Sequence, residues 1–238
     1  MILASINSQT KTIYMTSFMR DLYANIPNVG IRKLNSAYAV GGGPLLVSTI
    51  ESNYRVDIDN YASVDFSSMA NIIDLVGGVD LEVSTQEAGY INMYLDEQCG
   101  LQGLNASDYY VTGGGITHLN GNQAVGFARI RYTSRGNEHS DYGRTSRQRE
   151  ILVQLMQKAR SLDATTLLAV VNNMLPLITH NIDAATLTTL IANAPSYINY
   201  DIQTDRIPYD GLYSNLGEEL VPDFEATINR LHQTIYGN

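Results

Sequence analysis

The sequence predicts a single α/β domain with a central mixed β-sheet that is flanked by helices on both faces. Strand-like and helix-like segments alternate along 238 residues, without internal repeats, linkers or low-complexity blocks. The composition is 44% hydrophobic and 16% charged, which supplies enough apolar side chains for a sizeable core. One domain over residues 1–238 is therefore the economical interpretation.

The first half of the chain predicts strands that alternate with helices. The segment 12–18, TIYMTSF, carries apolar groups on both faces, as a buried central strand does. Residues 34–54 predict two short helices with a glycine break between them, the second opened by Pro44. The elements expected next are a strand at 61–66, a helix at 67–78, a strand at 79–83 and a helix at 86–98.

The second half predicts mainly helices. Asn120 is expected to cap a helix that starts the segment 120–132. A polar loop over 133–143 then leads into a long helix at 144–162. The remaining expected elements are helices at 164–178 and 184–198, a strand at 201–209 and a closing helix with Pro222 in its first turn.

The N-terminal segment starts directly in a strand-like run, and it shows no evident partner for the strand at 12–18. Each unpaired backbone group on a buried strand would cost about 1–3 kcal/mol. We therefore expect the chain to be a piece of a longer protein whose reading frame continues upstream of Met1.

The charge distribution indicates a local anion site on an acidic body. The formal net charge is -9, whereas nucleic-acid binding needs a widespread basic surface, so no nucleic-acid partner is expected. Six of the twelve arginines nevertheless fall between residues 129 and 149, a segment without lysine. Arginine binds carboxylate or phosphate through two parallel hydrogen bonds. Cys99 is the only cysteine and the four histidines lie far apart, so the sequence indicates no metal-ligand cluster.

The long helix is expected to direct two polar side chains inward. At 100° per residue, Arg144 and Gln148 fall in its apolar stripe, Arg147 lies on the flank, and Arg149 and Arg160 lie on the solvent side. A buried arginine needs an anion, and a helix N-terminus also favours phosphate.

Three further arginines could join that site. Arg129 and Arg131 would share a face if their segment is extended, and Arg20 follows the strand 12–18, where α/β sheets bind ligands. Internal ion pairing is the alternative, and from spacing alone the two readings are equally good. The carboxylates available for such pairing are those of Asp21, Glu138 and Asp141.

A family resemblance rests on five segments: TSFMRDLY, KLNSAYAVGGGPLLVSTIE, VDFSSMANIIDLVGGVDLEV, HLNGNQAVGFARIRY and DYGRTSRQREIL. In this order, over residues 1 to about 160, they resemble the LytR-CpsA-Psr family of Gram-positive cell-envelope proteins. The segment VPDFEATINRLHQTIY resembles the closing helix of that family.

The resemblance implies an activity that composition cannot show. Family members transfer glycopolymers, such as wall teichoic acid or capsule, from an undecaprenyl-pyrophosphate carrier to peptidoglycan. It also implies Mg²⁺ as a cofactor, an apolar tunnel for the polyprenyl chain, and an extracytoplasmic domain anchored by an N-terminal membrane helix.

The family motifs also imply roles for particular residues. Five of them match pyrophosphate ligands: Arg20, Arg129, Arg131, Arg144 and Gln148. Arg20 and Asp141 are the catalytic candidates, and Asp141 is expected to move a proton or to support a metal. Asp21 and Arg147 are secondary candidates.

The chain departs from the family pattern near its start. The two magnesium-binding aspartates of the family precede the stretch that matches Met1, so the metal ligands of this chain are unknown. Its first strands and membrane anchor are expected to be missing, and Met19 replaces the usual proline before Arg20.

Three functions stay open at this point. The first is a Mg²⁺-dependent glycopolymer phosphotransferase, and the second is a module that binds polyprenyl phosphate without turnover. The third is a transcriptional attenuator, which the acidic pI and the lack of a helix-turn-helix pattern count against.

Overall fold

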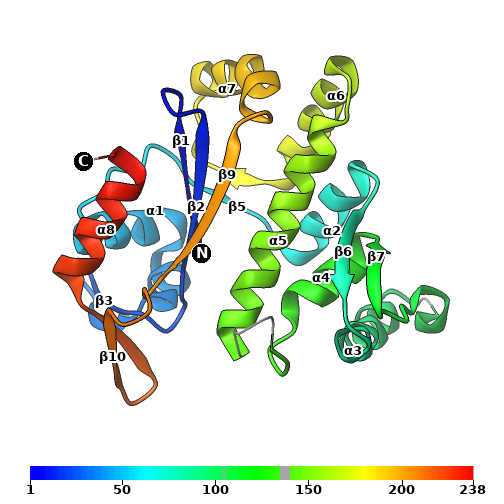
Figure 1. The fold of residues 1–238 in the computed structure, drawn as a ribbon, viewed down its shortest axis with the longest axis horizontal. Coiled ribbons are helices and arrows are strands. Elements are labelled where there is room, and N and C mark those ends of the chain that lie inside the picture. Colours follow the sequence, from blue (N-terminus) through cyan, green and yellow to red (C-terminus); the bar gives the residue numbers. More distant parts are fainter. Residues whose placement is uncertain (104, 135–139, 238) are drawn as a thin grey trace. The chain divides into compact units, whose positions relative to one another are not determined.

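The computed structural model of the protein describes residues 1–103, 105–134 and 140–237 (Figure 1). Its contacts divide the chain into two compact units, and each has its own packing. The first unit comprises Met1–Ser63, His180–Thr188 and Tyr200–Asn238, and the second comprises Val64–Thr179 and Thr189–Asn199. Across the described residues, no helix combines the length and the apolar character that a membrane crossing requires.

A mixed three-stranded sheet belongs to the first unit, with the order β1-β2-β9 (Figure 1). β1 (Ile2–Asn7) runs antiparallel to β2 (Thr12–Phe18), and β9 (Asp201–Ile207) runs parallel to β2 on its other side. Six of the seven residues of β2 are buried, as expected for a central strand. The predicted α/β class with a mixed sheet is confirmed.

The expectation that the strand at 12–18 lacks an N-terminal partner is wrong. Residues Ile2–Asn7 pair with it along its length, from Ile2 opposite Ser17 to Asn7 opposite Thr12. The Asn7 side chain accepts hydrogen bonds from the backbone N–H groups of Gln9 and Thr10, which closes the turn between the two strands. The backbone groups of β2 are therefore paired on both sides.

The helix α1 (Asn35–Tyr54) is broken where the sequence predicts a glycine break. Gly41 and Gly42 leave the helical conformation, and Gly42 has a φ of 62°, which glycine adopts without steric cost. A Cβ at the next residue, Gly43, would lie 2.4 Å from the ring of Tyr61, so the close approach also requires glycine. Pro44 then starts the second helical segment, as predicted.

Two antiparallel ribbons and a closing helix complete the first unit. The ribbons are β3 (Tyr23–Ile26) with β4 (Gly30–Lys33) and β10 (Tyr213–Leu216) with β11 (Glu219–Pro222). The closing helix α8 (Phe224–Tyr236) begins after Pro222, contrary to expectation. Asp223 caps this helix by accepting a hydrogen bond from the Ala226 N–H, and Pro222 ends the strand before it.

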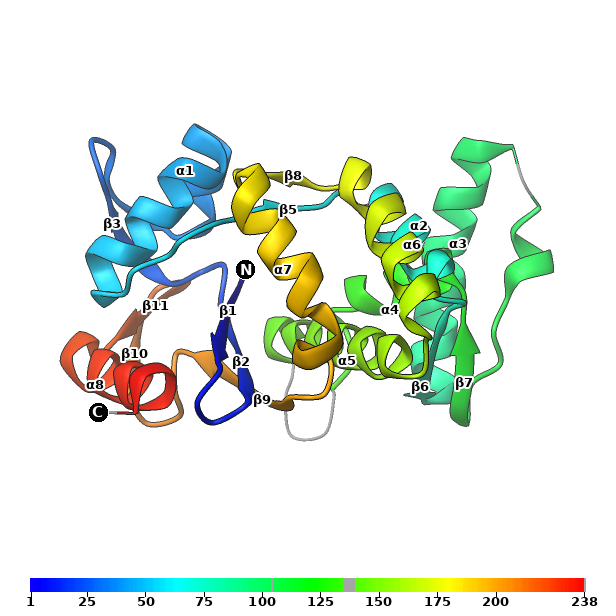
Figure 2. The ribbon, with the colours of Figure 1, turned by 90° about the horizontal axis from the view of Figure 1, so that it is seen from above.

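The second unit is mainly helical and contains one antiparallel ribbon, in which β6 and β7 lie side by side next to α3 (Figure 2). Asn120 caps α4 by accepting a hydrogen bond from the Gln123 N–H, which confirms the predicted cap. A Cβ at Gly121 would lie 2.0 Å from the Ala70 carbonyl oxygen, so α2 and α4 pack with their backbones close together. The elements are α2 (Phe66–Leu75), β6 (Val79–Val83), α3 (Thr85–Gln102), η1 (Ala106–Tyr109), β7 (Gly115–Leu119), α4 (Gly121–Arg129), α5 (Ser140–Arg160), α6 (Ala164–Met174) and η2 (Leu175–Leu177).

Some predicted boundaries differ from the structure. α5 begins at Ser140, so the end of the expected polar loop is helical, while residues 135–139 of that loop, Glu138 included, lie outside the described residues. The strand expected at 61–66 is only the two-residue β5 (Ala62–Ser63). The remaining elements are β8 (Thr179–His180) and α7 (Ala184–Tyr197).

Candidate functional site

Three of the predicted site residues meet at the start of α5, in the second unit. Arg144 Nη2 lies 3.2 Å from Asp141 Oδ1, and Arg131 Nε lies 3.7 Å from the same oxygen. The side chains of Asp141 and Arg144 are largely buried, whereas that of Arg131 is 45% exposed. We call Arg131, Asp141 and Arg144 the Asp141 cluster.

The electrostatics of the Asp141 cluster favour an anionic ligand. Within the cluster two guanidinium groups face one carboxylate, so the formal charges of these three side chains add up to +1. Asp141 lies in the first turn of the 21-residue helix α5, where the helix dipole adds further positive potential. Guanidinium groups so placed can bind phosphate oxygens through charge-assisted hydrogen bonds.

Arg147 is fully buried, and its contacts are those of a positioning residue. Its Nε donates to Glu87 Oε1 over 2.9 Å, and its terminal nitrogens donate to backbone carbonyl oxygens of Ile130, Thr133 and Ser134. It therefore ties the segment after α4 to α3 and α5. The helical wheel places Arg147 on the flank of the apolar stripe, and the structure shows that this position is fully buried. Its secondary role in pyrophosphate binding stays a prediction.

The helical-wheel prediction for the other polar residues of α5 holds only in part. Arg160 is exposed as expected, Arg144 is largely buried, and Gln148 is half-buried. Arg149 was expected on the solvent side, but only 8% of it is exposed. The first turns of α5 are covered on more sides than a single apolar stripe indicates, so periodicity alone misplaces Arg149.

Arg129 is the last residue of α4, and Ile130 and Arg131 follow the end of the helix. Its guanidinium lies 4.7 Å from the ring centroid of Tyr94 and 5.2 Å from that of Phe66, and its Nη2 is 3.6 Å from Glu97 Oε2. Arg131 instead pairs with Asp141. Arg129 and Arg131 thus have different partners, and a shared role in anion binding stays a prediction.

Arg20 and Asp21 belong to the first unit, directly after β2. Arg20 Nε lies 3.2 Å from Asp21 Oδ2, and Lys33 Nζ lies 3.2 Å from Asp21 Oδ1. Hydrogen bonds to Glu218 and to Asp21 raise the pKa of Lys33 above its ordinary value. Asp21 thus has the internal pairing that the sequence left as an alternative, and the role of Arg20 in anion binding stays a prediction.

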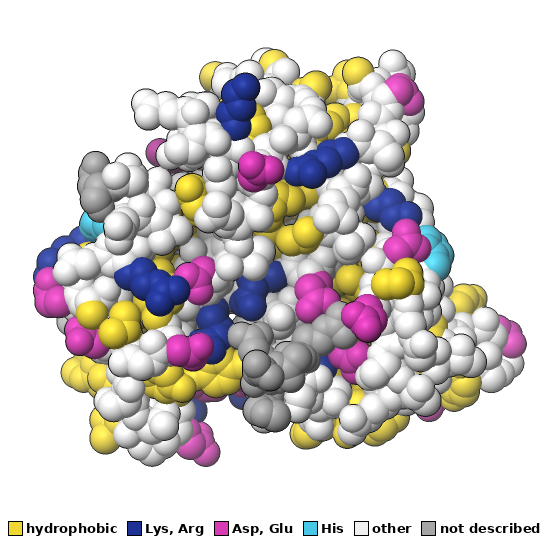
Figure 3. Space-filling model, viewed as in Figure 1, with side chains coloured by type: hydrophobic (Ala, Val, Ile, Leu, Met, Phe, Trp, Pro, Cys, Tyr) yellow, Lys and Arg dark blue, Asp and Glu magenta, His cyan; other side chains and the backbone are white. Residues whose placement is uncertain are grey.

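Charged side chains of both signs share the molecular surface. On the face shown in Figure 3, basic side chains are interspersed with acidic ones and do not form one broad basic area. Anion binding on such a surface depends on local groups such as the Asp141 cluster.

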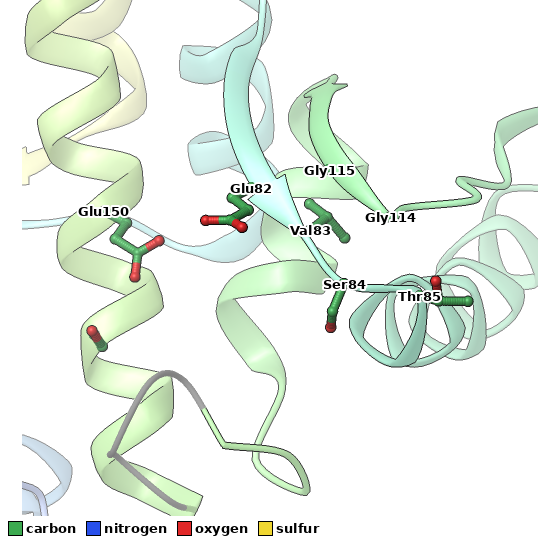
Figure 4. Close-up of a pocket in the computed structure, with 8 residues that line it drawn as sticks. Glu82, Val83, Ser84, Thr85, Gly114, Gly115 and Glu150 are labelled. Atoms are coloured by element: carbon green, nitrogen blue, oxygen red, sulfur yellow. The ribbon is translucent and has the colours of Figure 1, made fainter.

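An open cleft of about 880 Å³ lies elsewhere in the second unit, and its carboxylates were not predicted as site residues. Glu82 of β6 and Glu150 of α5 face each other across it (Figure 4). Two carboxylates repel a phosphate, so this cleft does not fit the predicted pyrophosphate site. In the sequence both residues look like ordinary surface glutamates. The full lining is Glu82, Val83, Ser84, Thr85, Gly114, Gly115, Ser146 and Glu150.

The described residues do not fit a magnesium site. Over the ranges that the structure describes, no three His, Cys, Asp or Glu side chains come together in a way that could hold a metal ion. Asp141, the aspartate of the motif segment, faces two arginines.

The sequence of the chain is similar to that of one protein family over nearly its full length. The model of the LytR_cpsA_psr family matches residues 1–231. The chain is 33% identical over 250 residues to the polyisoprenyl-teichoic acid–peptidoglycan teichoic acid transferase TagU of Oceanobacillus iheyensis, covering 100% of this chain and 69% of that protein. It is 32% identical over 181 residues to TagU of Enterococcus faecalis, covering 73% of this chain and 52% of that protein.

The fold of the chain is similar to that of a solved protein structure. The LytR-CPS2A-psr family protein YwtF (TagT) with bound octaprenyl pyrophosphate lipid matches with a TM-score of 0.68 and 20% identity, over 100% of this chain and 84% of that one. The chain spans about half to two thirds of the length of the two curated relatives. From the family match over residues 1–231 and the similarity along the full chain, we conclude that it belongs to the LytR-CpsA-Psr family.

Proposed function

We propose that the chain binds a glycopolymer linked to polyprenyl pyrophosphate and transfers the polymer to peptidoglycan. The observation that carries this proposal is the Asp141 cluster, in which Arg131 and Arg144 converge on one carboxylate at the N-terminus of a long helix. The names of the two relatives support a teichoic acid as the polymer. The lipid bound to the protein of the same fold supports a polyprenyl pyrophosphate as the carrier.

The transfer step makes one phosphorus–oxygen bond and breaks another. A hydroxyl oxygen of a peptidoglycan sugar attacks the phosphorus that carries the glycopolymer, and the bond to the polyprenyl phosphate breaks. The leaving polyprenyl phosphate keeps the electron pair, and Arg131 and Arg144 neutralise the charge that develops on it. The Asp141 carboxylate accepts the proton of the attacking hydroxyl.

Other parts of the proposal rest on the motif resemblance. Arg20, Arg129 and Gln148 are proposed as further pyrophosphate ligands, with Arg20 also catalytic. Mg²⁺ is proposed as a cofactor of the whole protein, where it would neutralise pyrophosphate charge, but no step above passes through it because the described residues do not fit a metal site. An extracytoplasmic location and a membrane anchor are proposed on the same basis.

A reconstituted transfer assay tests the function. The chain is incubated with a lipid-linked teichoic acid precursor or a lipid-linked capsule precursor, together with peptidoglycan. We expect polyprenyl monophosphate to be released and labelled teichoic acid to appear in peptidoglycan. Tight donor binding without release would support the alternative of a binding module without turnover, and failure to bind either donor would overturn the proposal.

Metal dependence is measured in the same system. We expect donor binding by this chain to change little when EDTA replaces Mg²⁺, because the described residues contribute arginines and no metal cluster. A loss of binding of tenfold or more, about 1.4 kcal/mol, on metal removal would contradict this expectation.

A further inference from the structure

Four aromatic side chains and one arginine follow one another across the second unit. The rings of Tyr132 and Tyr90 have centroids 6.0 Å apart, and the Arg129 guanidinium lies over the rings of both Tyr94 and Phe66. Tyr90 and Tyr94 are four residues apart on α3 and so share one face of that helix. We call Tyr132, Tyr90, Tyr94, Arg129 and Phe66 the aromatic row.

The two ends of the aromatic row are unusually accessible. Tyr132 is 74% exposed and Phe66 is 57% exposed, whereas Tyr90 and Tyr94 are partly buried and pack against the core. Gly89, the neighbour of Tyr90 on α3, is exposed, and a Cβ there would meet nothing within 4 Å. Exposed large rings that are connected through further, partly buried rings form a larger apolar surface than single exposed apolar residues do, and such surfaces mark binding sites.

Polar groups flank the rings of the aromatic row. Thr133 Oγ1 donates to Gln86 Oε1 over 3.1 Å beside the Tyr132 end, and Glu97 lies 3.6 Å from Arg129 near the other end. A ligand on this surface therefore meets ring faces together with donors and acceptors.

This combination fits a chain of sugars better than it fits a lipid. A pyranose ring offers C–H groups that can lie on an aromatic face and hydroxyls that bond polar groups at its edge. A polyprenyl chain would bury Arg129, Glu97 and Gln86 without returning hydrogen bonds, which is costly. A single-stranded nucleic acid could also stack on the rings, but the net charge of -9 opposes it.

The aromatic row is joined to the Asp141 cluster through the chain itself. Arg131, which pairs with Asp141, lies between Arg129 and Tyr132 in the sequence, and both of these belong to the row. A sugar bound on the row is thus close along the chain to the proposed pyrophosphate ligands.

We propose that the aromatic row binds the glycan strand of the acceptor peptidoglycan and so brings its sugar hydroxyls to the Asp141 cluster. The identity of the acceptor rests on the proposed function, whereas binding of a pyranose chain does not.

Binding by purified variants tests this proposal. Sedimentation with insoluble peptidoglycan and titration with soluble N-acetylglucosamine oligomers measure glycan binding. We expect Tyr132→Ala and Tyr90→Ala each to weaken it by about 3- to 10-fold, the range for an aromatic contact, while Tyr132→Phe retains it. Tyr236→Ala, an exposed tyrosine of the first unit, is the matched control and should bind like the parent chain. Thermal unfolding identifies any variant that is misfolded.

Binding of polyprenyl pyrophosphate to the same variants shows whether the aromatic row binds the acceptor glycan or the lipid-linked donor. We expect it to be unchanged in Tyr132→Ala and Tyr90→Ala. Parallel loss of lipid and glycan binding would show a lipid surface, and selective loss of teichoic acid binding would show a donor surface; either result overturns the proposal. Unchanged glycan binding by both variants and by the double variant would overturn it as well. If transfer fails while glycan binding depends on Tyr132, the proposed function falls and sugar binding by the row stands.

Discussion

Arg147 Nε donates to Glu87 Oε1 over 2.9 Å, and both side chains are buried in the second unit. The other carboxylate oxygen of Glu87 accepts hydrogen bonds from the backbone N–H and the hydroxyl of Ser84, each over 2.9 Å, at the N-cap of α3. One ion pair thus connects the start of α3 to α5. Through the carbonyl bonds of Arg147 it also holds the segment after α4, which carries Arg131.

We expect Arg147→Ala to lower the free energy of unfolding by about 3–5 kcal/mol, because it leaves the Glu87 carboxylate buried without its partner. Urea denaturation measures the change. Arg55→Ala is the control, because Arg55 pairs with Glu225 at the exposed surface and should cost about 1 kcal/mol or less. A loss at Arg147 no larger than at Arg55 would refute the structural role.

We expect Arg144→Ala and Arg131→Ala each to weaken binding of polyprenyl pyrophosphate by about 1.5–3 kcal/mol, the range for hydrogen bonds to charged groups. Titration with a soluble polyprenyl-pyrophosphate analogue measures the loss. Arg149 is buried and is therefore unsuitable as a surface control, so Arg160→Ala, an exposed arginine on the same helix, takes that place. Equal losses at all three positions would mean that only overall charge matters.

We expect Asp141→Asn to slow transfer by about 100-fold or more without weakening donor binding. The amide cannot accept the proton of the attacking hydroxyl, and general base catalysis contributes at least that factor. The substitution also removes the negative charge that faces Arg131 and Arg144, so donor affinity should hold or rise. Single-turnover kinetics together with equilibrium binding separate the two effects. Weaker donor binding with an unchanged rate would assign Asp141 to ligand binding.

We expect the ionised Asp80 carboxylate to stabilise the folded protein near neutral pH and to lose this effect in strong acid. Hydrogen bonds from Lys158 and His118 lower the pKa of Asp80 below its ordinary value of 3.8. A carboxyl with a lower pKa in the folded state stabilises the protein above its unfolded pKa, and that contribution disappears as the pH falls through the folded value. We expect Asp80→Asn to be less stable than the parent chain near neutral pH and equal to it in strong acid. The free energies of unfolding of both proteins, measured from strong acid to neutral pH, test this expectation. A stability difference that does not change with pH would contradict a lowered pKa of Asp80.

The sequence by itself determined the features that depend on neighbouring residues. The break in α1 follows from the conformational freedom of Gly42, and the start of α4 follows from the short-range hydrogen bond of Asn120 to Gln123. The sequence predicts the burial of β2 because apolar side chains occur on both of its faces. The motif segments also indicated the family, since their order and residue types are properties of the chain alone.

Only the tertiary structure decided which charged side chains are buried and with which partners. Arg147 finds its anion in Glu87, 60 positions away, and Arg129 finds its aromatic contacts on α2 and α3. The helical period places Arg149 on the solvent side although it is buried, because the period describes one helix and not the elements that cover it. Glu82 and Glu150 face each other although they are distant along the chain. The pairing of Ile2–Asn7 with β2 is local in sequence, but it requires the turn between the two strands to close. Burying a charge is favourable only with a partner in place, and the partner is brought there by the packing of the whole chain.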